Sequence, residues 1–147
     1  RVLFRSNVKG DNKPEDFYTD SKEAKEFVKD TNVDALAIAF GTSHGFYKAE
    51  PKLDFDVIQS CRESTDGIPL VMHGGSGVSD EGFRKAIESG IRKINYYSYM
   101  SKAGYLRAKE VIESNKTLYL HDVIYEAMKA MKENVKQAMK VFSFINN

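Results

Sequence analysis

Cysteine is almost absent from this sequence, whose 147 residues include one, Cys61. A single thiol excludes an internal disulfide framework and a cysteine-rich zinc cluster. The chain also lacks an excess of either charge, with 22 Lys and Arg residues against 21 Asp and Glu residues. This near balance provides no basic stripe of the kind that a nucleic-acid surface needs.

Long hydrophobic runs are missing as well. No apolar run approaches the roughly 20 residues that a membrane-spanning helix requires. The N-terminus does not show the basic and then apolar layout of a signal peptide. We therefore expect a cytoplasmic protein that binds neither membranes nor nucleic acid. We interpret Arg1–Ser6 (RVLFRS) as the in-frame translation of a sequencing adapter, followed by a polar lead-in over residues 7–18.

Helical and strand patterns alternate along the rest of the chain. Short runs of 4–8 mainly apolar residues are typical of strands buried on both faces of a parallel sheet. Three such runs are present: Ala35–Phe40, Ile68–Met72 and Ile91–Asn95. Apolar residues at helical spacing predict helices near 21–30, 54–63, 79–90, 98–114 and 122–142. This order predicts an α/β fold with parallel strands joined by crossover helices, in a barrel or an open sheet.

Particular residues mark the ends and faces of these helices. Asp20 and Ser79 are predicted N-caps, and Gly90 is placed to end the third helix. Cys61 lies on an apolar helix face, so we expect a small core residue rather than a nucleophile. The last helix carries an apolar stripe that we interpret as ordinary packing, made of Ile124, Met128, Met131, Val135, Met139 and Phe142. A complete eight-unit barrel takes about 250 residues, so three strands make only part of one.

Two histidines follow neighbouring strands. His44 comes four residues after the first apolar run, and His73 comes directly after the second. Ligands of α/β proteins bind beyond the carboxyl ends of parallel strands. Imidazole is the commonest metal ligand, and zinc accepts nitrogen and oxygen donors together. A single histidine at a strand end is more often a hydrogen-bonded structural residue, so the pattern alone leaves both interpretations open.

Glycines surround both histidines and suit a phosphate site. The segment HGGSG leads directly into a helix predicted to begin near Ser79. Backbone N–H groups and the helix dipole at such a place favour an anion. Ser76 could add a hydroxyl, and Asn95 and Ser98 follow the third strand at the same edge. The residues predict phosphate binding beside the histidine pair.

These motifs resemble a known family. DALAIAFGTSHGFYK, IPLVMHGGSG and KIN, in this order and spacing, are similar to the class II, metal-dependent ketose-bisphosphate aldolases. The resemblance runs over 19–147 and implies the last three strands of a (β/α)₈ TIM barrel, with their helices. It implies that His44 and His73 are two of three zinc ligands. It also implies a set of substrate and phosphate contacts: Gly45, Lys48, Gly74, Gly75, Ser76, Asn95, Tyr96, Tyr97 and Ser98.

The sequence departs from the family pattern in two places. Tyr96 and Tyr97 stand where the family has small or aliphatic residues, although Ser98 keeps a hydroxyl. The third zinc histidine and the catalytic aspartate of the family belong to an earlier strand, which this chain does not contain. We therefore expect no catalytic acid or base here. His121, at the start of the last helix, is expected to be an exposed surface residue.

The resemblance implies an activity for the full-length protein. That activity is zinc-dependent, reversible aldol cleavage of a ketose 1,6-bisphosphate to dihydroxyacetone phosphate and an aldehyde phosphate. A homo-oligomer is expected at full length, and the isolated chain is expected to be inactive. Fructose and tagatose bisphosphates are not distinguished. Two alternatives remain: a metal-independent, phosphate-binding barrel enzyme, and a non-catalytic metal- or phosphate-binding module.

Overall fold

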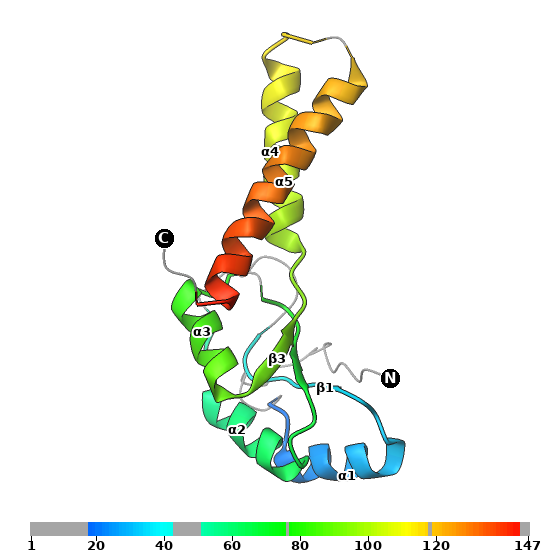
Figure 1. Ribbon diagram of the computed structural model, residues 1–147, viewed down its shortest axis with the longest axis vertical. Helices are drawn as coiled ribbons and strands as arrows, with labels where there is room; N and C mark the ends of the chain where they lie inside the picture. Colours follow the sequence, from blue (N-terminus) through cyan, green and yellow to red (C-terminus); the bar gives the residue numbers. More distant parts are fainter. Residues whose placement is uncertain (1–17, 43–50, 76, 118, 145–147) are drawn as a thin grey trace, which may run out of the picture. The chain divides into compact units, whose positions relative to one another are not determined.

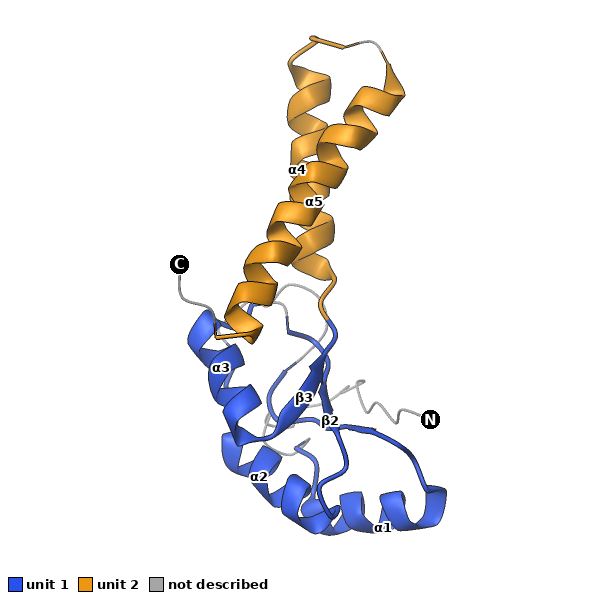
Figure 2. Cartoon of the chain, in the orientation of Figure 1, with its two compact units in different colours: residues 1–95 blue, residues 96–147 orange. Residues whose placement is uncertain are grey.

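Helices and strands alternate as predicted. The computed structural model describes residues 18–42, 51–75, 77–117 and 119–144. Along the chain they form α1 (Ser21–Thr31), β1 (Leu36–Ala37), α2 (Phe55–Ser64), β2 (Leu70–Met72), α3 (Asp80–Ser89), β3 (Ile91–Ile94), α4 (Ser98–Glu113) and α5 (Leu120–Phe142) (Figure 1). The chain divides into two compact units, residues 1–95 and 96–147 (Figure 2). The adapter-like residues 1–6 and the lead-in up to residue 17 lie outside the described residues.

The first unit contains a parallel sheet in the order β1-β2-β3. Leu36 of β1 lies opposite Leu70 of β2, which in turn lies opposite Ile91 of β3. The α/β class with three parallel strands is therefore confirmed. The ladder of β1 is shorter than its apolar run because the backbone leaves the sheet at Ala39. There Ala39 bonds to Thr19 instead, through its N–H and its carbonyl, both at 2.8 Å.

The core of this unit lies between the sheet and α1–α3. Its fully buried side chains come from all three strand regions and from α2: Phe40, Ile58, Cys61, Leu70, Met72 and Ile91. Cys61 is a core residue, as predicted. Burial raises the pKa of its thiol to about 11, and the nearby negative charge of Asp20 adds to the shift.

The helix ends follow the predicted caps. The Asp20 carboxylate accepts hydrogen bonds from the N–H groups of Lys22 and Glu23 at the start of α1. Ser79 Oγ accepts the N–H of Gly82 at 3.1 Å at the start of α3. Gly90 ends α3 with φ of 139°, a conformation that a residue with a Cβ rarely adopts. Asp20 and Ser79 thus fix where α1 and α3 begin at the carboxyl edge of the sheet, and Gly90 fixes where α3 ends before β3.

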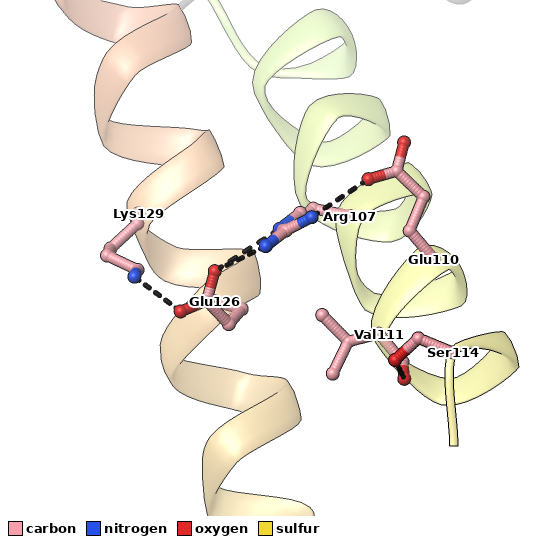
Figure 3. Close-up of polar contacts among 6 residues, drawn as sticks. All are labelled: Arg107, Glu110, Val111, Ser114, Glu126 and Lys129. Atoms are coloured by element: carbon pink, nitrogen blue, oxygen red, sulfur yellow. Dashed lines mark hydrogen bonds and ion pairs between the residues drawn. The ribbon is translucent and has the colours of Figure 1, made fainter. Parts of the chain in front are cut away.

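The second unit is a hairpin of α4 and α5, which pack along each other (Figure 2). Gly104 is buried at this contact, where a Cβ would lie 2.7 Å from Cγ of Met131. Arg107 of α4 reaches Glu126 of α5 through Nη2 at 2.8 Å, and Lys129 also pairs with Glu126 (Figure 3). Small-residue packing and a charged cluster therefore join the two helices.

The apolar stripe of α5 packs only in part. Met131 lies against Gly104 of α4, whereas Ile124, Met128 and Met139 are 49%, 60% and 59% exposed. Within this unit α5 has one helix, α4, to pack against, and a single neighbour covers only part of an amphipathic face. Among the described residues, no helix has the length and apolar character needed to span a membrane.

Candidate metal and phosphate site

His73 and Asn95 lie side by side where β2 and β3 end. The backbone N–H of Asn95 donates to the carbonyl of Met72 at 3.0 Å, which aligns the ends of the two strands. The Asn95 Nδ2 atom lies 3.0 Å from His73 Nε2 and 3.2 Å from His73 Nδ1. Both side chains are half-buried. The predicted meeting of polar groups at this edge of the sheet is therefore present for these two residues.

Lys93 joins this pair, and sequence reasoning missed it. Its ammonium donates a hydrogen bond to Asn95 Oδ1. The signal was present in the motif KIN, because residues two apart on a strand lie on the same face. Lys93, Asn95 and His73 therefore form a continuous polar chain at the carboxyl edge.

The glycines after His73 have structural reasons to be glycine. Gly74 has φ of 66°, in the left-handed region. Gly75 is buried, and a Cβ there would lie 3.0 Å from the Phe83 ring of α3. This close packing brings the loop against the start of α3. Because Asp80 and Glu81 already occupy the first turn of α3, an anion would be favoured at the loop N–H groups rather than at that turn.

Backbone contacts after β1 join residues 40–41 to residues 52–54. The Asp54 N–H donates to the Phe40 carbonyl at 2.9 Å. Gly41, with φ of 106°, approaches Lys52 so closely that a Cβ would lie 1.9 Å from the Lys52 carbonyl oxygen. The Tyr18 hydroxyl donates to the same oxygen at 2.8 Å. This neck, which the sequence did not predict, holds together the two ends of the segment that carries His44.

Several predicted site residues cannot be placed in this arrangement. His44, Gly45, Lys48 and Ser76 lie outside the described residues. Their assignments stay predictions.

Tyr96, Tyr97 and Ser98 belong to the second unit. There the Tyr96 hydroxyl donates to Asn134 Oδ1 at 2.9 Å, and its ring meets the Phe142 ring edge-on at a centroid distance of 6.0 Å. Tyr97 is 67% exposed, and Ser98 opens α4. Tyr96 thus packs within the hairpin, and the phosphate role of these three residues stays a prediction.

The described residues do not make a zinc site by themselves. No group of three or more His, Cys, Asp or Glu side chains is assembled for a metal in the described part of the chain. His73 supplies one imidazole, and the neighbouring amide nitrogen of Asn95 is a donor rather than a ligand. His121 is a surface residue, as expected: its side chain is 79% exposed, and its ring stacks on Tyr119 at 5.4 Å.

Comparison with known proteins agrees with the sequence motifs. Residues 5–147 match the family described as "Fructose-bisphosphate aldolase class-II". The family match begins at residue 5, upstream of Thr19, at which the resemblance of the motifs begins. The chain belongs to this class II aldolase family.

Individual relatives cover the same region. The chain is 40% identical to the uncharacterized protein YdjI of Escherichia coli K12, over 85% of this chain and 43% of that protein. It is also 40% identical to a fructose-bisphosphate aldolase of Staphylococcus aureus, over 88% of this chain and 45% of the relative. It therefore spans about half the length of the curated relatives that it matches.

Solved structures show the same partial correspondence. The crystal structure of the YdjI aldolase from E. coli K12 aligns with a TM-score of 0.76 and 39% identity, over 85% of this chain and 46% of that one. A fructose-bisphosphate aldolase from Campylobacter jejuni, 17% identical, shares the fold with a TM-score of 0.74 over 49% of its chain. The three strands and their helices are thus part of the fold of these aldolases.

Proposed function

We propose that the full-length protein is a zinc-dependent aldolase, which reversibly cleaves a ketose 1,6-bisphosphate to dihydroxyacetone phosphate and an aldehyde phosphate. The observation that carries the proposal is the juxtaposition of His73, Asn95 and the Gly74–Gly75 loop at the carboxyl edge of a parallel sheet. Family membership supports the reaction class. The bisphosphate and the metal follow from the resemblance of the motifs.

Each residue of this edge has a proposed task. His73, with His44, would hold the metal, which would supply Lewis-acid stabilisation of negative charge on a substrate oxygen. The backbone N–H groups of Gly74 and Gly75, in the loop that leads to α3, would bind the substrate phosphate. Asn95 would add a donor from β3. Together they would fix the reacting carbon relative to the metal.

Further contacts and properties are part of the proposal. Gly45, Lys48, Ser76 and Ser98 would complete the phosphate contacts, and Tyr96 and Tyr97 would shape the rim. The third metal ligand and the catalytic aspartate would come from sequence upstream of this chain. The full-length protein would be a homo-oligomer.

The test is an aldol-cleavage assay on the full-length gene product with fructose and tagatose 1,6-bisphosphates, before and after chelation. We expect cleavage that chelation abolishes and zinc restores. Cleavage that survives complete metal removal would support the metal-independent barrel enzyme instead. Binding of zinc or phosphate without any cleavage would support the non-catalytic module.

A matched pair of variants links the activity to the site. His73→Ala should abolish zinc-dependent cleavage, whereas His121→Ala should leave it unchanged, because His121 is exposed at the start of α5.

A further inference from the structure

The Lys93 side chain lies beside the candidate site because of an irregularity in the sheet. Between Leu70 and Val71 the register shifts: Leu70 lies opposite Ile91, but Val71 lies opposite Lys93. Arg92, the residue passed over, directs its guanidinium to the Ile87 carbonyl of α3 at 2.9 Å. A one-residue shift exchanges the two faces of a strand, and such irregularities re-aim side chains near functional sites. Lys93 and Asn95 thereby share the face that meets His73.

The hydrogen-bond chemistry of the three side chains permits one orientation of the Asn95 amide. An asparagine side chain has an acceptor oxygen and a donor nitrogen, whereas a lysine ammonium only donates. The bond from Lys93 therefore requires the oxygen of Asn95 on its side. The nitrogen then faces His73, at 3.0 Å from Nε2. Without Lys93, a half-turn of the amide would place the acceptor toward the site instead.

We propose that Lys93 is a positioning residue, which holds the Asn95 amide so that its NH₂ group is presented to an anion. The proposal rests on the proposed function, in which Asn95 contacts the substrate phosphate. When His73 holds the metal, its imidazole offers no free acceptor, so the hydrogens of the Asn95 NH₂ group are available to a phosphate oxygen. Lys93 acts through Asn95 rather than by touching the ligand. The substrate feature that this arrangement reads is a phosphate monoester.

The first experiment measures phosphate binding with inorganic phosphate as the probe. The Asn95 side-chain amide resonances of the chain are followed by NMR during a phosphate titration. Lys93→Met, which removes the donor but keeps the length, should weaken binding about tenfold, or ~1.4 kcal/mol. Lys93→Arg keeps a donor-only group and should retain most of the affinity. Lys85→Met is the matched control: it removes one exposed lysine charge from α3, where Lys85 pairs with Glu81 at 2.8 Å, and should change nothing at Asn95.

A double-mutant cycle separates positioning from simple charge attraction. If Lys93 acts through Asn95, Lys93→Met should have almost no further effect on phosphate affinity in an Asn95→Ala background. An equal loss in both backgrounds would show that Lys93 attracts the anion directly, and would overturn the proposal. Lys93→Gln provides a second test should Lys93→Met not fold, and should give an intermediate loss. A wild-type Asn95 amide that does not respond to phosphate would also overturn it.

Kinetics of the full-length protein distinguish this inference from the proposed activity. Lys93→Met should raise KM for the bisphosphate about tenfold with little change in kcat, because the phosphate contact is made equally in the ground state and the transition state. If wild-type cleavage is present and Lys93→Met leaves KM unchanged, the positioning role fails while the aldolase function stands. If wild-type cleavage is absent, the proposed function fails, and the NMR cycle still decides the role of Lys93.

Discussion

Two glycines with positive φ, Gly41 in the neck after β1 and Gly67, differ in the atoms that surround them. Alanine substitutions at these two positions test whether the Lys52 carbonyl requires a glycine at position 41. Gly41 has φ of 106°, and a Cβ there would lie 1.9 Å from the oxygen and 2.8 Å from the carbon of the Lys52 carbonyl. Gly67 has φ of 78°, and a Cβ there would meet nothing within 4 Å. Alanine at either position is strained, but only at Gly41 does it collide with backbone.

The expected losses of stability follow from two energies, the cost of a positive φ and the cost of overlap with the Lys52 carbonyl. Left-handed backbone costs an L-residue about 1–2 kcal/mol, and a rigid overlap costs about 1–3 kcal/mol more. Gly41→Ala should therefore lower the free energy of unfolding by about 2–5 kcal/mol. Gly67→Ala should lower it by about 1 kcal/mol, since alanine also restricts the unfolded chain. Because Gly41 closes the segment that carries His44, Gly41→Ala should also lower the zinc content of the full-length protein.

Urea unfolding followed by circular dichroism measures both variants against the wild-type protein. Zinc content is determined on the same preparations. Equal destabilisation by the two substitutions would refute the argument, because it would mean that the Lys52 carbonyl does not limit the space at Gly41. A destabilised Gly41→Ala protein with full zinc content would keep the packing argument but refute the link to His44.

The remaining predictions concern the hairpin and the core. Gly104→Ala should destabilise the wild-type hairpin, because Met131 lies where the new methyl group would go. In a Met131→Ala protein the same substitution should stabilise the hairpin by about 1 kcal/mol, because alanine has the higher helix propensity. Thermal unfolding of the four proteins measures both effects. Lys129 and Arg107 lower the pKa of the Glu126 carboxyl group. The ionised carboxylate therefore stabilises the folded protein above the ordinary pKa of 4.5, and this stabilisation is lost as the pH falls through the lowered pKa. Glu126→Gln should therefore lower the melting temperature at neutral pH and low salt, with little effect in strong acid or molar salt; an equal effect in all conditions would contradict this. Burial raises the pKa of the Cys61 thiol from 9.0 to about 11. The neutral thiol therefore contributes fully to the stability of the fold below pH 9.0, and this contribution is lost as the pH rises through about 11. Cys61→Ala should flatten the pH dependence of stability across that window, and native Cys61 should resist iodoacetamide at pH 8 until the protein unfolds.

Most helices and strands could be predicted because their signals are local. Asp20, Ser79 and Gly90 fix helix ends by hydrogen bonds and backbone conformation within a few residues. Short apolar runs identified the three strands for the same reason. The point at which β1 leaves the ladder depends instead on Thr19, which bonds to Ala39 from 20 residues away. No local pattern contains that contact.

The candidate site was predictable in its location but not in its details. His73 and Asn95 follow strands, so the parallel topology alone brings them to one edge. Lys93 was missed although it lies two residues before Asn95 and therefore on the same face of β3; its contact with Asn95 is a side-chain hydrogen bond that no pattern of residues displays. The apolar stripe of α5 indicated that this face can pack, without showing how much of it has a neighbour, and Met128 is exposed.

The most direct test of the account is metal-dependent aldol cleavage by the full-length protein that contains this chain. Cleavage of fructose and tagatose 1,6-bisphosphates is measured by the release of dihydroxyacetone phosphate, in the apo protein, with added zinc, and in the His73→Ala variant. We predict turnover that requires zinc and is lost in His73→Ala. Turnover by the chelated protein, or unchanged zinc-dependent turnover in His73→Ala, would contradict the assignment of this edge as the metal site.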